Sequence, residues 1–288
     1  MKSLNLKSYA KINLSLLIGQ KTKNNYHNLK SVMQTVSLKD KIKLKKNKKI
    51  ICKTNVKNIP TNEENLAVKA AKVFFNHLNL NSGVLIKIKK KIPTKAGLAG
   101  ASSNAAATLL GLNKLYKKNL SKKTLLNLAK EIGSDVSFLI CGGSALVEGT
   151  GGLVFQLNPL KKCYFLIVKP NFSISTKKAY EKFDEIKKSN INSSLTQKIL
   201  NSINQNEKIN KTAKYFFNNF EQIFKKDSEI FKIKKQMLKK GAISSILTGS
   251  GSCVFGVFKN KKEAKLAKKY FKKQKFLTFL CTPIKKYF

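Results

Sequence analysis

The sequence predicts an α+β protein of two domains. At 288 residues the chain is long enough for about two packed cores, and 42% of its residues are hydrophobic. Strand-like alternation and helical periodicity both occur in each half of the chain. The order of strand-like and helical segments changes near residues 155–162. We therefore expect one domain over residues 1–157 and another over residues 158–288.

Each expected element follows from this reading of periodicity. The expected strands of the first half are at residues 12–18, 31–38, 42–44 and 84–89. Its expected helices are at about residues 65–78, from Ser102 onward, and near residues 122–132. In the second half we expect a buried strand at residues 165–169, a polar stretch over residues 189–210 that joins helical segments, and a turn within residues 246–258.

The charge of the chain is unusual. It holds 58 basic and 14 acidic residues, a formal net charge of +44, and no arginine. Clustered cations would indicate a nucleic-acid-binding module, because they gain affinity by releasing phosphate counterions. The lysines instead occur in nearly every segment, and arginine is the usual residue for bidentate recognition of bases and phosphates. We expect a solvated lysine surface and no specific nucleic acid partner, and a basic nucleic-acid-binding module stays as an alternative.

The five cysteines are odd in number and scattered, and they lack C-x-x-C spacing. This pattern argues against a disulfide framework and against a zinc site. The sequence has no apolar run of membrane-spanning length, and its first residues lack the apolar core of a signal peptide. We expect a cytoplasmic protein with reduced thiols and no membrane partner; the sequence does not predict the oligomeric state.

The most informative segment joins the strand at residues 84–89 to the next helix. Pro93 ends the strand because it has no backbone N–H, and the pattern P-x-x-x-G-L-A-G-A-S-S follows. Ser102, Ser103 and Asn104 are typical N-cap residues. A helix N-terminus preceded by glycines favours anions, which predicts a nucleoside triphosphate site. A plain turn at a helix start is the alternative, and neither G-x-x-x-x-G-K-[ST] nor G-x-G-x-x-G is present.

This segment resembles the ATP loop of the GHMP kinases, the family of galactokinase and of homoserine, mevalonate and phosphomevalonate kinases. The resemblance implies a two-domain α+β GHMP kinase fold, with a ribosomal-protein-S5-domain-2-like N-terminal half and a ferredoxin-like C-terminal half. It also implies ATP as cofactor, with Mg²⁺ bridging the nucleotide phosphates and metal ligands that the sequence leaves unknown. The implied ATP-binding residues are Asn65, Lys90, Pro93, Thr94, Lys95, Ala96, Gly97, Leu98, Ala99, Gly100, Ala101, Ser102 and Ser103.

Three further motifs, at residues 9–40, 133–136 and 247–256, resemble one branch of the family, which phosphorylates the 2-hydroxyl of a cytidine-diphosphate-linked methylerythritol. Residues 9–16 read Y-A-K-I-N-L-S-L, similar to the opening strand A-K-[IL]-N-L. The resemblance implies that Lys11 stabilises the catalytic base and the developing negative charge, although by itself Lys11 reads as one solvent-facing lysine of a strand. Tyr26 and His27 are implied to pack on and hydrogen-bond the cytosine.

Asp135 lies in the segment Gly133-Ser134-Asp135-Val136, which resembles G-[SA]-D-[VI] of the family. The resemblance implies that Asp135 is the general base, which orients the hydroxyl and accepts its proton. A lone Asp after Gly-Ser is otherwise a turn or N-cap residue.

Residues 247–256 resemble a late glycine turn of the family, in which glycines let backbone approach the substrate closely. A hairpin with two glycines is the alternative reading. The implied substrate-binding residues are Asn13, Tyr26, His27, Thr176 and Gly249.

The sequence departs from the family pattern in two segments. Residues 19–25 lack the usual arginine and Asp-Gly turn, although Asn25 can adopt the left-handed conformation that glycine usually takes. Ala99 stands where glycine is more usual, which adds a methyl group close to the expected triphosphate. A GHMP kinase of the homoserine or mevalonate type is a further alternative, and the Tyr26-His27 pair argues against it.

Overall fold

The structure is a computed structural model that describes residues 3–22, 26–186 and 194–285; Asn25 lies outside these residues. The strands are β1 (Ser3–Asn13), β2 (Ser15–Lys21), β3 (His27–Asn47), β4 (Ile51–Thr54), β5 (Gly83–Lys89), β6 (Ser144–Gly149), β7 (Leu153–Gln156), β8 (Tyr164–Lys169), β9 (Phe217–Asn218), β10 (Ser244–Leu247), β11 (Val254–Phe258) and β12 (Leu277–Cys281). The helices are α1 (Leu66–His77), α2 (Gly100–Leu115), α3 (Lys122–Ile132), α4 (Val136–Cys141), α5 (Thr176–Glu185), α6 (Ser194–Asn204), α7 (Ile209–Ala213), α8 (Glu229–Lys239), α9 (Lys261–Lys273) and the 3₁₀ helix η1 (Asn219–Ile223). This mixture of helices and sheets confirms the predicted α+β class.

The chain divides into two compact units that alternate along the sequence. The first unit comprises Met1–Ala10, Leu38–Thr94 and Ala99–Cys141. The second unit comprises Lys11–Ser37, Lys95–Leu98 and Gly142–Phe288. The expected domain boundary between residues 157 and 158 stays a prediction, because neither unit is one uninterrupted stretch of the chain.

The first unit packs helices on a sheet. In that sheet β5 lies between β4, to which it is parallel, and the C-terminal part of β3, to which it is antiparallel. Helix α1 packs against α2, α3 and β5. Helix α2 approaches the sheet closely, since a Cβ atom on Gly111 would lie 2.3 Å from a methyl carbon of Leu6.

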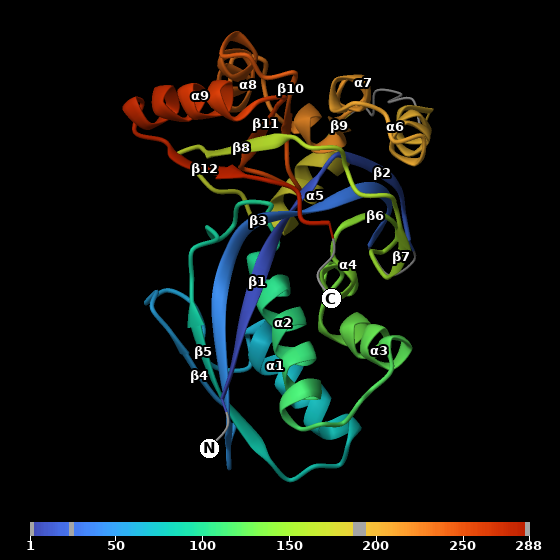
Figure 1. The fold of residues 1–288 in the computed structure, drawn as a ribbon, viewed down its shortest axis with the longest axis vertical. Helices are drawn as coiled ribbons and strands as arrows, with labels where there is room; N and C mark the ends of the chain where they lie inside the picture. The colour runs from blue at the N-terminus through green and yellow to red at the C-terminus, as the bar shows by residue number, and fades with distance from the viewer. Residues whose placement is uncertain (1–2, 23–25, 187–193, 286–288) are drawn as a thin grey trace. The chain divides into compact units, whose positions relative to one another are not determined.

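The second unit contains a four-stranded antiparallel sheet in the order β10-β11-β8-β12. Helix α8 packs on β10 and β11, and α9 packs on β8, β11 and β12, both on the same side of the sheet (Figure 1). Taken along the chain, β8, α8, β10, β11, α9 and β12 give the strand-helix-strand-strand-helix-strand arrangement of a ferredoxin-like domain. The predicted ferredoxin-like character of the C-terminal half is therefore confirmed.

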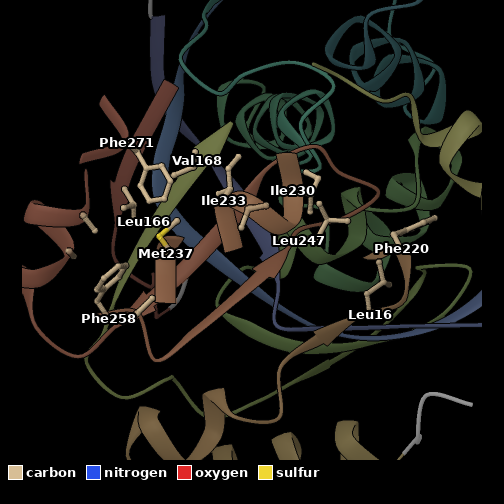
Figure 2. Close-up of a cluster of buried hydrophobic side chains, with 14 of the residues drawn as sticks. Leu16, Leu166, Val168, Phe220, Ile230, Ile233, Met237, Leu247, Phe258 and Phe271 are labelled. Carbon is tan, nitrogen blue, oxygen red and sulfur yellow. The ribbon is translucent and has the colours of Figure 1, made fainter. Parts of the chain in front are cut away.

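The second unit is stabilised by one large hydrophobic core (Figure 2). Leu166 and Val168 of β8 pack in it with Ile233 and Met237 of α8, and all four side chains are buried. Leu16 of β2 belongs to the same core, although it lies 150 residues earlier in the chain than Leu166. The second unit therefore needs the early segment Lys11–Ser37 to complete its interior.

Several expected elements match the structure and others differ. Helices α1 and α3 and strand β5 lie where periodicity predicted them. The strand expected at residues 12–18 is divided at Leu14 between β1 and β2, and the runs at residues 31–38 and 42–44 belong to the single long strand β3. The charged residues Lys39, Asp40 and Lys41 separate those two runs in the sequence, but the strand continues through them and Asp40 is buried. Of the polar stretch at residues 189–210, residues 189–193 lie outside the described residues.

Candidate active site

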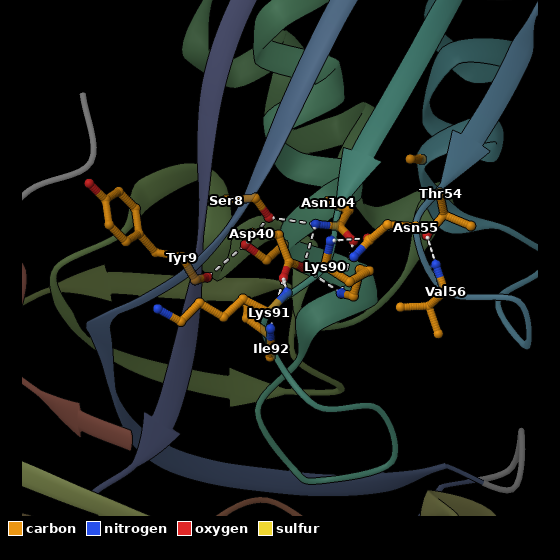
Figure 3. Close-up of polar contacts among 12 residues, drawn as sticks. Ser8, Tyr9, Asp40, Thr54, Asn55, Val56, Lys90, Lys91, Ile92 and Asn104 are labelled. Atoms are coloured by element: carbon orange, nitrogen blue, oxygen red, sulfur yellow. Dashed lines mark hydrogen bonds and ion pairs between the residues drawn. The ribbon is translucent and has the colours of Figure 1, made fainter. Parts of the chain in front are cut away.

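The entry to the glycine-rich loop is held by a carboxylate in the first unit. Strand β5 ends at Lys89, and the next residues turn so that the backbone N–H groups of Lys91 and Ile92 donate to Oδ1 of Asp40, at 2.6 and 2.8 Å. Figure 3 shows these two hydrogen bonds converging on Asp40. The loop therefore begins from a fixed backbone position.

Lys90 also lies on this carboxylate. Its Nζ forms an ion pair with Oδ2 of Asp40 and donates to Oδ1 of Asn104 at 3.1 Å, and only 6% of the side chain is exposed. The structure thus distinguishes Lys90 from the many solvated lysines. Direct contact between Lys90 and ATP stays a prediction.

The apex of the loop, Lys95–Leu98, belongs to the second unit and contacts the late glycine turn there. Gly97 has φ of 72°, and a Cβ atom on it would lie 2.0 Å from the carbonyl oxygen of Thr248. The carbonyl of Leu98 accepts a hydrogen bond from the backbone N–H of Lys11 at 3.2 Å. Only glycine fits at position 97, because both its φ and its contact with Thr248 exclude a side chain.

The loop ends at Ala99, which is the N-cap of α2 with φ of 51° and makes no side-chain capping hydrogen bond. The prediction that Ser102, Ser103 and Asn104 cap this helix was therefore wrong. The Ser103 hydroxyl instead donates to the carbonyl of Tyr9 at 2.6 Å, and Asn104 binds Asp40. No side chain caps the first turn of α2, so its N–H groups suit an anion, and phosphate binding at this turn stays a prediction.

Lys11 and Asn13 form a buried polar cluster with the late glycine turn of the second unit. Lys11 Nζ donates to Asn13 Oδ1 at 2.8 Å, and the same oxygen accepts from the backbone N–H of Gly249 at 2.9 Å. The Thr248 hydroxyl accepts from the backbone N–H of Asn13 at 3.2 Å. Lys11 is 4% exposed and Asn13 is 1% exposed, so the reading of Lys11 as a solvent-facing lysine is wrong.

Two residues that the sequence analysis missed hold this turn in place. Asn218 donates from one amide to the carbonyls of Leu247 and Gly249, both at 2.9 Å. Glu221 accepts from the backbone N–H of Leu247 at 2.8 Å. Both come from the β9–η1 segment, and no local motif in the sequence marks them.

Thr176 lies at the first position of α5, where its hydroxyl is 3.2 Å from that of Ser250 in the turn. Ser175 is the N-cap of α5, and its hydroxyl accepts from the backbone N–H of Lys178 at 3.2 Å. The structure therefore brings Asn13, Thr176 and Gly249 of the predicted substrate residues to one turn, through Thr248 and Ser250.

His27 takes part in a second cluster of the second unit. Its Nε2 lies 2.8 Å from Asp184 Oδ1, its ring stacks on Tyr180 with centroids 5.0 Å apart, and its side chain is 3% exposed. Neighbouring Tyr26 is 66% exposed. Sequence reasoning missed Asp184 and Tyr180, which lie about 150 residues later in the chain and carry no recognisable motif.

The pKa of Asp184 is lowered by this cluster. Partial burial favours the neutral acid, but hydrogen bonds and charges from Lys21 and His27 outweigh it and favour the carboxylate. His27 therefore faces an anion at every pH above the acid range. The tautomer of His27 is set by this contact, because one ring nitrogen is already occupied.

Two further predicted residues, Asn65 and Asp135, lie in the first unit. Asp135 is half-buried in the turn before α4, where its carbonyl accepts from the N–H of Leu139 at 3.1 Å. Asn65 is the N-cap of α1, accepting from the N–H of Ala67 at 2.9 Å and donating to the carbonyl of Pro60 at 2.6 Å. Asp135 and Lys11 belong to different units, so their pairing stays a prediction, as does contact between Asn65 and ATP.

Comparison with known proteins gives consistent findings. The family of GHMP kinases N terminal domains matches residues 65–143, and the family of GHMP kinases C terminal domains matches residues 196–276. A 4-diphosphocytidyl-2-C-methyl-D-erythritol kinase from Lachnoclostridium phytofermentans is 40% identical, with 96% of this chain and 97% of that protein covered. The enzyme of the same name from Clostridium tetani is 42% identical over 88% of this chain and 91% of its own length. A crystal structure of a 4-(cytidine 5'-diphospho)-2C-methyl-D-erythritol kinase has the same fold, with a TM-score of 0.78, 24% identity, and coverage of 97% of this chain and 99% of that one.

Proposed function

The chain belongs to the GHMP kinase family, and on this basis we propose that it transfers the γ-phosphoryl group of ATP to the 2-hydroxyl of 4-diphosphocytidyl-2-C-methyl-D-erythritol. This reaction is a step of the non-mevalonate route to isoprenoid precursors. The observation that most supports it is the cluster in which Lys11 and Asn13 hold the glycine turn at Gly249, because three of the predicted substrate residues, Asn13, Thr176 and Gly249, meet at that turn.

ATP binds through the loop from Pro93 to Ser103 in this proposal. The N–H groups at the start of α2 bind the phosphates, and the alternation of Lys95, Gly97 and Ala99 in the left-handed region shapes the backbone before them. Phosphoryl transfer requires little covalent chemistry from the protein, so fixed positions and charges supply most of the acceleration.

Asp135 acts as the general base on the acceptor hydroxyl. It takes the hydroxyl proton as the new oxygen–phosphorus bond forms, and the bond to the leaving ADP breaks. Lys11 supplies a fixed cation that stabilises the negative charge developing on the attacking oxygen. Asn13 orients that cation, since it accepts the hydrogen bond from Lys11 Nζ.

The cytidine end of the substrate is recognised by Tyr26 and His27. Tyr26 is exposed and offers a ring face for stacking. The ring of His27 is held by Asp184 and Tyr180 through Nε2 and stacking, so the second ring nitrogen is the ring atom proposed to hydrogen-bond the base. Thr176 and Gly249 contact the remainder of the acceptor.

We also propose that Mg²⁺ accompanies ATP. Among the described residues no group of three His, Cys, Asp or Glu side chains could hold a metal, and the Ser103 hydroxyl is engaged with Tyr9. The part of the chain that the structure describes therefore offers no carboxylate set for this ion, and Mg²⁺ is expected to bind mainly to nucleotide phosphates and water. No step of the chemistry above is derived from it.

The reaction is placed in the cytoplasm in this proposal. All five cysteines are free and buried, which is typical of proteins in a reducing compartment. None of the described helices is long and apolar enough to cross a membrane.

A substrate panel tests the proposed reaction. ADP release is measured with 4-diphosphocytidyl-2-C-methyl-D-erythritol, homoserine and mevalonate as acceptors. We expect rapid turnover only of the cytidine-linked acceptor, because only that acceptor can use Tyr26 and His27. Faster turnover of homoserine or mevalonate would overturn the assignment.

A further inference from the structure

The first unit buries one carboxylate that the proposed chemistry does not use. Asp40 lies in β3 and is 0% exposed. Burying an unpaired carboxylate costs free energy, so a buried carboxylate needs donors around it. Which groups donate to Asp40 therefore indicates its role. Among the described residues, four groups donate hydrogen bonds to Asp40, and all four lie at the entry or the exit of the glycine-rich loop.

Three of these donors belong to the loop entry. The N–H groups of Lys91 and Ile92 donate to Oδ1, and Nζ of Lys90 pairs with Oδ2. The backbone N–H of Lys90 donates to Asn55 Oδ1 at 2.7 Å, which fixes the same segment from its other side. The end of β5 is thus tied to a residue in the interior of β3.

The fourth donor leads to the loop exit. Nδ2 of Asn104, in the first turns of α2, donates to Asp40 Oδ2 at 2.9 Å and to the Ser8 hydroxyl at 2.8 Å. The Ser8 hydroxyl donates to that of Ser103 at 2.8 Å, and Ser103 donates to the carbonyl of Tyr9. Figure 3 shows Asp40 between Ser8, Asn104 and Lys90. One carboxylate is therefore connected to both ends of the loop.

We propose that Asp40 is a positioning residue for ATP: it fixes the separation between the end of β5 and the start of α2, and thereby the direction of the N–H groups that bind the phosphates. Lys90 acts on ATP through this carboxylate, because its Nζ is buried on Asp40. Lys90 also neutralises the carboxylate, so that no unpaired negative charge lies below the phosphate site. The inference rests on the proposed function, since it assumes that the loop binds ATP.

Asp40→Asn tests the proposal at constant shape. The variant replaces one of the two carboxylate oxygens with an NH₂ group. If Oδ2 is replaced, the NH₂ group faces the donors of Asn104 and Lys90. If Oδ1 is replaced, it faces the backbone N–H groups of Lys91 and Ile92. We expect KM for ATP to rise about ten- to a hundredfold, as expected for misplaced binding groups, while KM for the acceptor stays unchanged. Loop amides at residues 93–99 should exchange hydrogen faster in the unliganded variant.

Tyr116→Phe is the matched control. The Tyr116 hydroxyl donates to the carbonyl of Gly83 at 2.6 Å, so its loss weakens the opposite end of the same strand without touching the loop. The control should leave KM for ATP and loop exchange at their native values. A KM shift shared by Asp40→Asn and Tyr116→Phe would show that Asp40 acts only on general stability and would overturn the proposal.

Ser8→Ala provides a test that does not depend on the folding of Asp40→Asn, and Lys90→Met tests whether Lys90 acts through Asp40. Ser8→Ala cuts the connection to Ser103 while leaving all donors on Asp40, and it should raise KM for ATP in the same direction by a smaller factor. Combining Lys90→Met with Asp40→Asn should cost less than the product of the two single effects, because both remove one interaction. Multiplicative effects would make Lys90 an independent ATP ligand and contradict the proposal.

Hydrogen exchange separates this inference from the proposed reaction. If the native protein turned over none of the acceptors, the exchange measurement on unliganded protein would still report whether Asp40 holds the loop. Native loop exchange in Asp40→Asn and in Ser8→Ala would overturn the positioning role even if the kinase reaction were established.

Discussion

At the scale of single residues, the proposed chemistry depends most on Asp135 and Lys11. Asp135→Asn keeps the shape of the side chain and removes its charge, so we expect kcat to fall by about 10² to 10⁴ with little change in KM for either substrate. Lys11→Met should also lower kcat. The measurement is steady-state kinetics with both substrates varied.

The double variant of Asp135 and Lys11 tests whether the two act together. If Lys11 serves the same proton transfer, the combined loss should be smaller than the product of the single losses. Near-native kcat in Asp135→Asn would remove the proposed base and leave Asp135 as a turn residue before α4.

Single residues also show where sequence reasoning reached its limit. Lys11, Asn13 and Gly249 could be found because each lies in a local motif, and the structure joins them through one amide oxygen. Asp40 ends a motif of the branch at residues 31–40, but its buried role and the role of Asp184 could not be found, because partners such as Lys91 and His27 are 51 and 157 residues away. A contact of that range depends on how strands pair, which no local pattern encodes.

At the scale of elements, Asn65 has a structural role that competes with its predicted role in ATP binding. Its side chain caps α1, so Asn65→Ala should cost about 1 kcal/mol of stability. Asn65→Ser keeps a capping oxygen but loses the amide donor to the Pro60 carbonyl, so it should lose less stability than Asn65→Ala. If the amide also contacts ATP, both variants should raise KM for ATP.

Chemical unfolding and steady-state ATP kinetics of Asn65→Ala and Asn65→Ser distinguish the capping role of Asn65 from a role in ATP binding. Native KM in Asn65→Ser, together with a lower unfolding free energy in Asn65→Ala, would assign Asn65 to the helix cap alone.

Elements with local signals were predicted well and elements without them were not. Ser121 caps α3, as a serine before a helical run usually does, and the bounds of α3 match the predicted helix at residues 122–132. The start of α2 differed because Ala99, a residue with a methyl group, occupies the left-handed conformation. Propensity alone disfavours that conformation for alanine and favours the serines and Asn104 as caps.

At the scale of the whole molecule, buried thiols make stability depend on alkaline pH. Burial raises the pKa of Cys163 from 9.0 to about 12 and that of Cys52 to about 11. Below pH 9 both the folded and the unfolded chain keep these thiol protons, so the thiols do not lower the free energy of unfolding there. Above pH 9 the unfolded chain loses protons that the folded chain keeps, and stability falls as pH rises, by up to about 1.4 kcal/mol per pH unit for each thiol.

Cys163→Ala isolates this effect from the titration of the lysines, which both proteins share. Urea unfolding under reducing conditions at pH 8, 9 and 10 should show the difference in unfolding free energy between native and variant proteins shrinking as pH rises. A constant difference across this range would contradict the assignment.

The alternation of the two compact units along the chain limits how such a gene can be rearranged. The second unit takes Leu16 and Ile18 of its core, and the turn partners Lys11 and Asn13, from the first 37 residues of the chain. A recombination event in the middle of the gene would join a late half to an early half that had not evolved with it, and would divide one hydrophobic core between two ancestries. We therefore expect viable hybrids between relatives to inherit residues 11–37 together with the C-terminal half, so that the unit of inheritance is discontinuous in sequence.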